Sequence, residues 1–68
     1  MATFRFKQPP VTWSPDVQAR ARYLETIGEA DYWAVDGNVY KYENGVARWF
    51  CTMYAWEGNL YFLRRDHG

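Results

Sequence analysis

Polar and apolar residues alternate near the start of the chain, over residues 3–7, as they do in a strand that buries one of its faces. Two prolines at 9–10 end this strand, because proline cannot donate a hydrogen bond to a neighbouring strand. Further along, Val17, Ala21 and Leu24 recur at the spacing of one helix face. The pattern therefore predicts a strand, a short connector and a helix.

The bounds of the predicted helix are indicated by the residues at its two ends. Ser14 can accept a hydrogen bond from a free backbone amide, Pro15 suits the first helical position, and Asp16 faces the positive end of the helix dipole. Gly28 is typical of the position just after a helix. We therefore predict one helix over residues 15–27.

The rest of the chain has the pattern of an antiparallel β-meander over residues 31–65. Asp-Gly at 36–37 and Asn-Gly at 44–45 are typical of two-residue hairpin turns, and residues 57–59 give a third, less defined turn. The third strand is long enough to bend or bulge. The last strand is not assigned to a face, because the loop before it can have two or three residues. The two lengths place its side chains on opposite faces of the sheet. The expected strands are 31–35, 38–43, 46–56 and 60–65.

The two sharp turns determine which residues lie opposite each other, because side chains alternate between the faces of a sheet. One face is expected to carry the row Trp33, Tyr40 and Trp49, continued by apolar residues at 51, 53 and 55. We expect the core on this face, covered by the helix. On the opposite face, Val39 is expected to pair with Phe50. That second face, of mixed polarity, is expected to carry Tyr32, Lys41, Arg48, Phe50, Tyr54 and Trp56.

These elements predict an α+β fold: one small domain over residues 1–68, in the order β-α-β-β-β-β, with the helix packed on one face of the sheet. The place of the first strand in the sheet stays open. The chain begins at Met1, and we expect a complete small protein. With a single cysteine it cannot form an intrachain disulfide. Its four Trp, six Tyr and four Phe predict that dense aromatic packing, or self-association, supplies the stability.

The residues that carry chemistry do not form a catalytic pattern. Cys51 lies in the middle of a predicted strand, and the one histidine, His67, is close to the end of the chain, so a thiol with a neighbouring base is not expected. The chain has no glycine-rich phosphate loop. A structural zinc site needs four Cys or His ligands, and the chain has two. We expect no enzyme, no catalytic residue, no cofactor and no metal site.

The mixed face is the candidate for binding, because protein interfaces are enriched in Tyr, Trp, Phe and Arg. We expect a non-enzymatic protein-interaction module that binds and modulates or occludes a larger protein partner, as small phage-type inhibitors do. A homodimer through this face is one form of that expectation. The alternative is a single-stranded nucleic acid stacked on the same aromatic and basic side chains, although eight basic and eight acidic residues give no net charge.

A membrane partner is not expected, because no apolar stretch is long enough to cross a bilayer. The first residues lack the apolar segment of a signal peptide, and the single cysteine suits a reducing compartment. The sequence therefore predicts a cytoplasmic protein.

Overall fold

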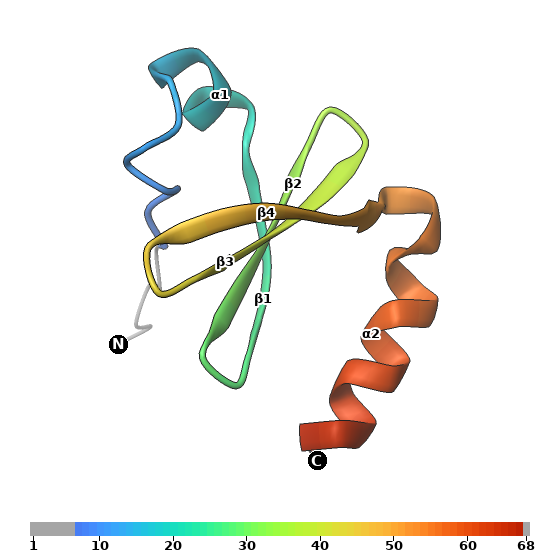
Figure 1. The fold of residues 1–68 in the computed structure, drawn as a ribbon. Coiled ribbons are helices and arrows are strands. Elements are labelled where there is room, and N and C mark those ends of the chain that lie inside the picture. The colour runs from blue at the N-terminus through green and yellow to red at the C-terminus, as the bar shows by residue number, and fades with distance from the viewer. Residues whose placement is uncertain (1–6, 68) are drawn as a thin grey trace, which may run out of the picture.

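The computed structural model describes residues 7–67, which form a four-stranded antiparallel sheet with a short helix before it and a longer helix after it (Figure 1). The strands lie in the sheet in chain order, which confirms the α+β class and the meander. The expected strand over residues 3–7 lies outside the described residues except for Lys7, which is in a loop. The elements are α1 (Pro15–Arg20), β1 (Arg22–Ile27), β2 (Ala30–Val35), β3 (Asn38–Glu43), β4 (Val46–Thr52) and α2 (Met53–His67).

The predicted helix over residues 15–27 is wrong in its second half. Its start is correct, and Ser14 Oγ accepts a hydrogen bond from the backbone amide of Val17 at 3.3 Å. The helix ends at Arg20, however, and β1 follows as the neighbour of β2. The signal that misled is Gly28, whose φ of +64° serves the β1–β2 hairpin turn rather than a helix end. Both structures need a residue that tolerates positive φ, so this glycine does not distinguish them.

The predicted strand over residues 60–65 is also wrong, because this segment belongs to α2. Trp56, Leu60 and Leu63 are spaced as on one helix face, and all three pack against the core. The hydroxyl of Thr52 accepts a hydrogen bond from the Ala55 amide at 3.3 Å and satisfies one free donor at the start of the helix. The element order is therefore α-β-β-β-β-α.

The register predicted from the two sharp turns is confirmed for most of the sheet. Tyr40 pairs with Trp33 on one side and with Trp49 on the other, as expected. One pairing is wrong: Val39 lies opposite Cys51 and not Phe50, because a bulge interrupts β4 at this point. The extra residue moves the end of β4 by one position relative to β3 and so changes the face on which Cys51 lies.

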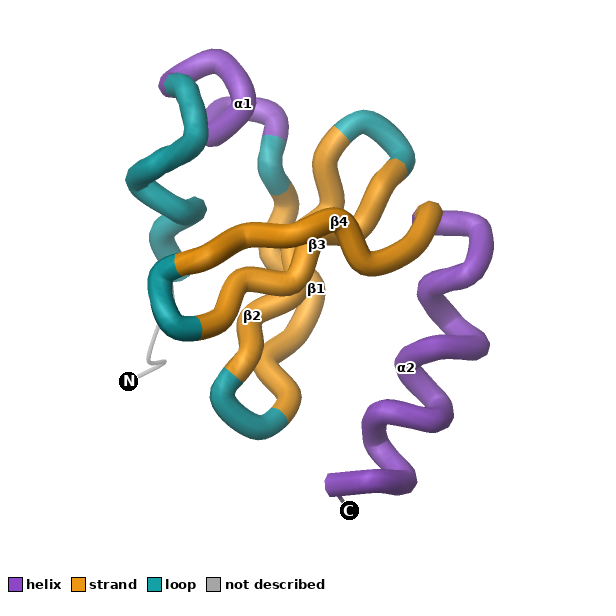
Figure 2. The backbone as a smooth tube through the Cα atoms, viewed as in Figure 1, coloured by secondary structure: helices purple, strands orange, loops and turns teal. Residues whose placement is uncertain are grey.

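The predicted core face is correct only in part: Trp33 is buried there, with 2% of its surface exposed, but α2 packs on the opposite side of the sheet. The face of Tyr32 lies beneath α2, whereas Trp49 on the other face is 58% exposed. That other face is covered in part by the N-terminal segment and α1, where Trp13 meets Tyr40 edge to face at 5.6 Å. Figures 1 and 2 show α1 and α2 well apart, with the twisted sheet between them. The buried cluster under α2 consists of Ile27, Ala30, Tyr32, Val39, Cys51 and Trp56.

Candidate functional site

Three of the six predicted partner-binding residues form the centre of the core. Tyr32 and Trp56 are buried, with 2% and 6% of their surface exposed, and Phe50 is partly buried beside them. The ring of Tyr32 lies 5.2 Å from that of Trp56 and 5.3 Å from that of Phe50, measured between centroids. These distances are typical of favourable aromatic pairs. The expectation that these three aromatic side chains are open to a partner is therefore wrong, because α2 covers the part of the face that carries them.

The other three predicted residues lie on three different elements. Lys41 on β3 is partly buried and pairs with Glu43 at 3.5 Å. Arg48 lies opposite it on β4 and is exposed. Tyr54 lies in the first turn of α2 and is 99% exposed. The structure thus brings Lys41 and Arg48 together as strand neighbours, while Tyr54 belongs to a different surface.

Tyr54 belongs to the side of α2 that points away from the sheet. Because Trp56, Leu60 and Leu63 face the core, the helical period places a second set of residues outward. Besides Tyr54, this set has two aromatic residues: Tyr61 is 61% exposed and Phe62 is 63% exposed. We call this surface the outer face of α2, and it consists of Tyr54, Gly58, Tyr61, Phe62 and Arg65.

Gly58 interrupts the outer face in the middle of the helix. A Cβ atom added at this position would have no atom within 4 Å, so no contact inside the domain requires glycine here. Glycine in a helix interior costs roughly 0.5–1 kcal/mol relative to alanine. The fold therefore does not explain this residue, although it lies between Tyr54 and Tyr61 on the exposed side.

The helix packs on the sheet through Trp56, Leu60 and Leu63, and this packing sets the direction of its outer face. Arg64 donates two hydrogen bonds to the Glu25 carboxylate on β1, from Nε at 3.0 Å and from Nη2 at 2.6 Å. These hydrogen bonds raise the pKa of Arg64 above its already high ordinary value. This ion pair adds a polar contact to the apolar packing of Trp56, Leu60 and Leu63 against the sheet.

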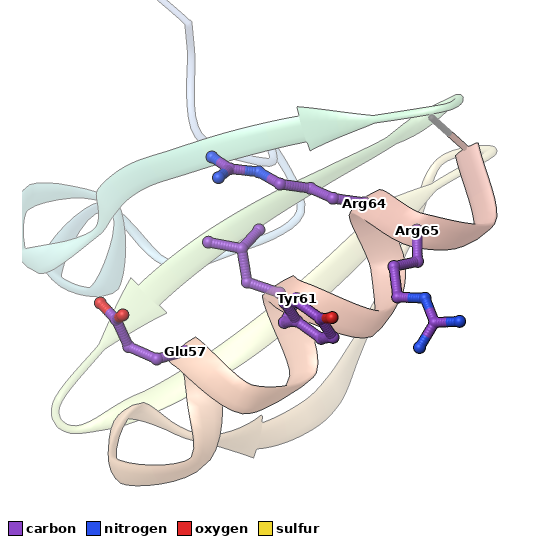
Figure 3. Close-up of a pocket in the computed structure, with 5 residues that line it drawn as sticks. Glu57, Tyr61, Arg64 and Arg65 are labelled. Carbon is purple, nitrogen blue, oxygen red and sulfur yellow. The ribbon is translucent and has the colours of Figure 1, made fainter.

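A shallow groove of about 650 Å³ runs along one flank of α2 (Figure 3). In this view Arg64 extends from the helix across the sheet, whereas Arg65 points away from it. The Arg65 guanidinium lies 5.9 Å from the centroid of the Tyr61 ring, within the range of a cation–π contact. The lining residues are Glu57, Leu60, Tyr61, Arg64 and Arg65.

The surface beside α1 carries several contacts within the chain. Arg20 bridges the carboxylates of Asp16 and Asp36. Trp49 donates from its indole nitrogen to the side-chain oxygen of Asn38 at 3.0 Å. These polar side chains therefore have partners within the domain, whereas the buried indole nitrogen of Trp33, on the sheet face beside α1, has none among the described residues.

The chemistry of Cys51 is that of a buried structural residue. The thiol is 7% exposed, and burial raises its pKa above the ordinary value of 9.0. The reactive thiolate is therefore rare at neutral pH. Among the side chains that the structure describes, those of residues 7–66, no group of three or more His, Cys, Asp or Glu is arranged to hold a metal ion.

Sequence reasoning found Tyr54 but missed Tyr61, Phe62, Gly58 and Arg65. It assigned residues 60–65 to a strand, so these side chains were never placed on one surface with Tyr54. The signal that could have found them is the spacing of Trp56, Leu60 and Leu63, which defines a helix whose other side must face outward.

Comparisons with protein-family models, with characterised proteins and with solved structures give no match for this chain. In the part of the chain that the structure describes, neither helix has the length and apolar character needed to cross a bilayer.

Proposed function

We propose that this chain is a non-enzymatic protein-interaction module and that it binds its partner through the outer face of α2. The observation that carries the proposal is the exposure of Tyr54, Tyr61 and Phe62 on the side of α2 that points away from the sheet. Together these rings expose roughly 350–550 Å². This is as large as the largest apolar patch on a typical monomer, and such patches are often functional.

The composition of the outer face also favours a protein partner. Tyrosine, phenylalanine and arginine are enriched at protein interfaces, and aromatic residues and arginine supply most of the binding energy where they are fully covered. The aromatic part of the core beneath α2 is formed by Tyr32, Phe50 and Trp56. The aromatic residues on the outer face therefore do not contribute to the core. A module of this kind acts by covering or modulating a surface of its partner, as small inhibitor proteins do.

The alternative expectation, a single-stranded nucleic acid, has less support than before. Its stacking platform needs Tyr32 and Phe50 to be open, whereas Tyr32 is buried and Phe50 is partly buried against the core. On α2, the Arg64 charge is neutralised by Glu25, which leaves Arg65 without a basic neighbour to attract phosphates.

Site-specific photo-crosslinking in native cells tests the proposal. A photoreactive phenylalanine analogue replaces Tyr54, which is 99% exposed, and in the control chain it replaces Val11, which is 81% exposed on the N-terminal segment. We expect a protein adduct from position 54 and none from position 11. Adding Phe62→Ser to the first chain should remove the adduct while the far-UV circular dichroism stays unchanged.

Two outcomes would contradict the proposal. Equal adducts from both positions would mean that the outer face of α2 has no preference for a partner. An adduct from position 54 that disappears on nuclease treatment would identify a nucleic acid as the bound species.

A further inference from the structure

The two ends of the outer face of α2 complement each other. Tyr54, in the first turn, projects its whole side chain into solvent. Toward the other end, the groove lies beside Tyr61, Arg64 and Arg65 (Figure 3). Ten or eleven residues separate Tyr54 from the two arginines, which is about 16 Å along a helix that rises 1.5 Å per residue. Tyr54 does not line the groove of its own chain, which begins about one turn further along the helix, at Glu57.

We infer that α2 binds α2 of a second copy of this chain in an antiparallel pair, with Tyr54 of each copy in the groove of the other. The inference rests on the proposed function and names the partner of the same surface. A two-fold axis brings the projecting ring of one copy to the groove of the other, and it does so twice. Each dimer thus forms the same contact at both ends.

The register of this pair is determined by a second, independent feature. If Tyr54 lies opposite Arg65 of the second copy, antiparallel pairing places Gly58 opposite Tyr61 of that copy. Gly58 presents bare backbone with open space above it, so a tyrosine ring can lie directly on the helix there. The ring-and-groove contact and the glycine-and-ring contact are therefore both formed in this one register. In this arrangement Gly58 leaves room for the Tyr61 ring of the second copy. This role explains a glycine for which the isolated domain gives no reason.

The charges on this face are compatible with the pair. Arg65, which already lies over Tyr61, reaches the face of the incoming Tyr54 ring in the same way. Glu57 lies about one turn from Arg65 of the second copy, so opposite charges flank the contact. The charge of Arg64 is neutralised by Glu25 within each copy. The two Arg64 side chains therefore do not add repulsion between the copies.

The available area suits a reversible dimer. The three aromatic rings of both copies contribute roughly 700–1,100 Å². With Arg65 and the walls of the groove, the total approaches the roughly 1,000–1,200 Å² at which specific interfaces begin. We therefore expect a dimer that forms in the micromolar range.

Sedimentation equilibrium on the full chain tests this inference. The variants are Tyr54→Ser, which removes the projecting ring, and Gly58→Gln, which fills the space above the helix backbone. The conservative variant is Tyr54→Phe, and the control is Val11→Ser on an exposed residue elsewhere. We expect wild type to dimerise, the first two variants to raise the dissociation constant at least about tenfold, and the last two to change it by less than about threefold.

A wild-type chain that stays monomeric throughout the micromolar range would overturn the inference and would leave the proposed function with a different protein as partner. A dimer that is insensitive to both Tyr54→Ser and Gly58→Gln would overturn the inference and would also place the interaction surface away from α2.

Discussion

Replacing Trp56 by alanine tests the location of the core, with Trp49 as a matched control on the other face of the sheet. The ring of Trp56 lies 5.2 Å from Tyr32 and 6.3 Å from Phe50, and the residue is 6% exposed. A buried aromatic side chain removes about 150–250 Å² from water, or about 4–6 kcal/mol at 25 cal/mol per Å². This is an upper figure, because the unfolded chain already buries part of that surface.

We expect Trp56→Ala to lower the free energy of unfolding by about 3–5 kcal/mol, as large-to-small changes of buried tryptophan do. That is comparable to the whole stability of a domain of this size. Trp49 is 58% exposed, so less than half of its surface is lost to packing, and Trp49→Ala should cost about 1–2 kcal/mol.

Urea denaturation followed by far-UV circular dichroism measures both changes without relying on tryptophan fluorescence. Trp56→Phe belongs in the series, because it keeps part of the buried ring and leaves a folded fraction large enough to measure. A Trp49→Ala variant that loses as much stability as Trp56→Ala, or more, would refute the placement of α2 over the face of Tyr32.

Two glycine substitutions should change stability in opposite directions in urea denaturation at concentrations where the chain is monomeric. Gly45 has a φ of +79°, so Gly45→Ala should cost about 1–2 kcal/mol, and a neutral result would refute the turn geometry. Gly58 has open space and no positive φ, so Gly58→Ala should add roughly 0.5–1 kcal/mol, and a loss would mean that the domain itself needs this glycine. Burial raises the pKa of Cys51, so its contribution to stability is complete below the unfolded value of 9.0 and is lost as pH rises through the folded value. Stability should therefore fall less between neutral pH and pH 10 in Cys51→Ala than in wild type, and equal pH dependence would contradict this assignment.

The sheet could be predicted because its signals are local. Asn44 and Asp36 adopt φ angles of +53° and +49°, and each is followed by a glycine with positive φ. Such turns determine the pairing of their two strands without any information from elsewhere in the chain. The rows through Tyr40 and Lys41 therefore came out correctly from the sequence.

The faces could not be predicted in the same way, because they depend on what covers the sheet. Both faces carry large aromatic residues: Tyr32 and Phe50 on one, Trp33 and Tyr40 on the other. The composition of the two faces therefore does not show on which of them α2 packs. The bulge in β4 adds a second source of error, since it moves Cys51 to the face beneath α2.

The candidate surface could not be predicted either, because it lies on α2, a helix that was not predicted from the sequence. Residues 57–59, with Gly58 in the middle, have the composition of a turn, although they lie inside α2. The sequence therefore predicts a turn where the structure has a helix. Tertiary packing of Trp56, Leu60 and Leu63 outweighs the local cost of the glycine. Only when this helix is in place do Tyr54, Tyr61 and Phe62 share a surface, and this is why five of the six predicted binding residues do not lie on it.

A dilution series of ¹H–¹⁵N correlation spectra tests the central claim most directly, because it locates the interface residue by residue on the unmodified chain. We predict that concentration-dependent shifts are confined to the backbone amides around Tyr54, Gly58, Tyr61, Phe62 and Arg65 and approach saturation within the micromolar range. Shifts concentrated along the exposed edge of β4, over residues 46–52, or spectra that do not change with concentration, would contradict an α2-mediated pair.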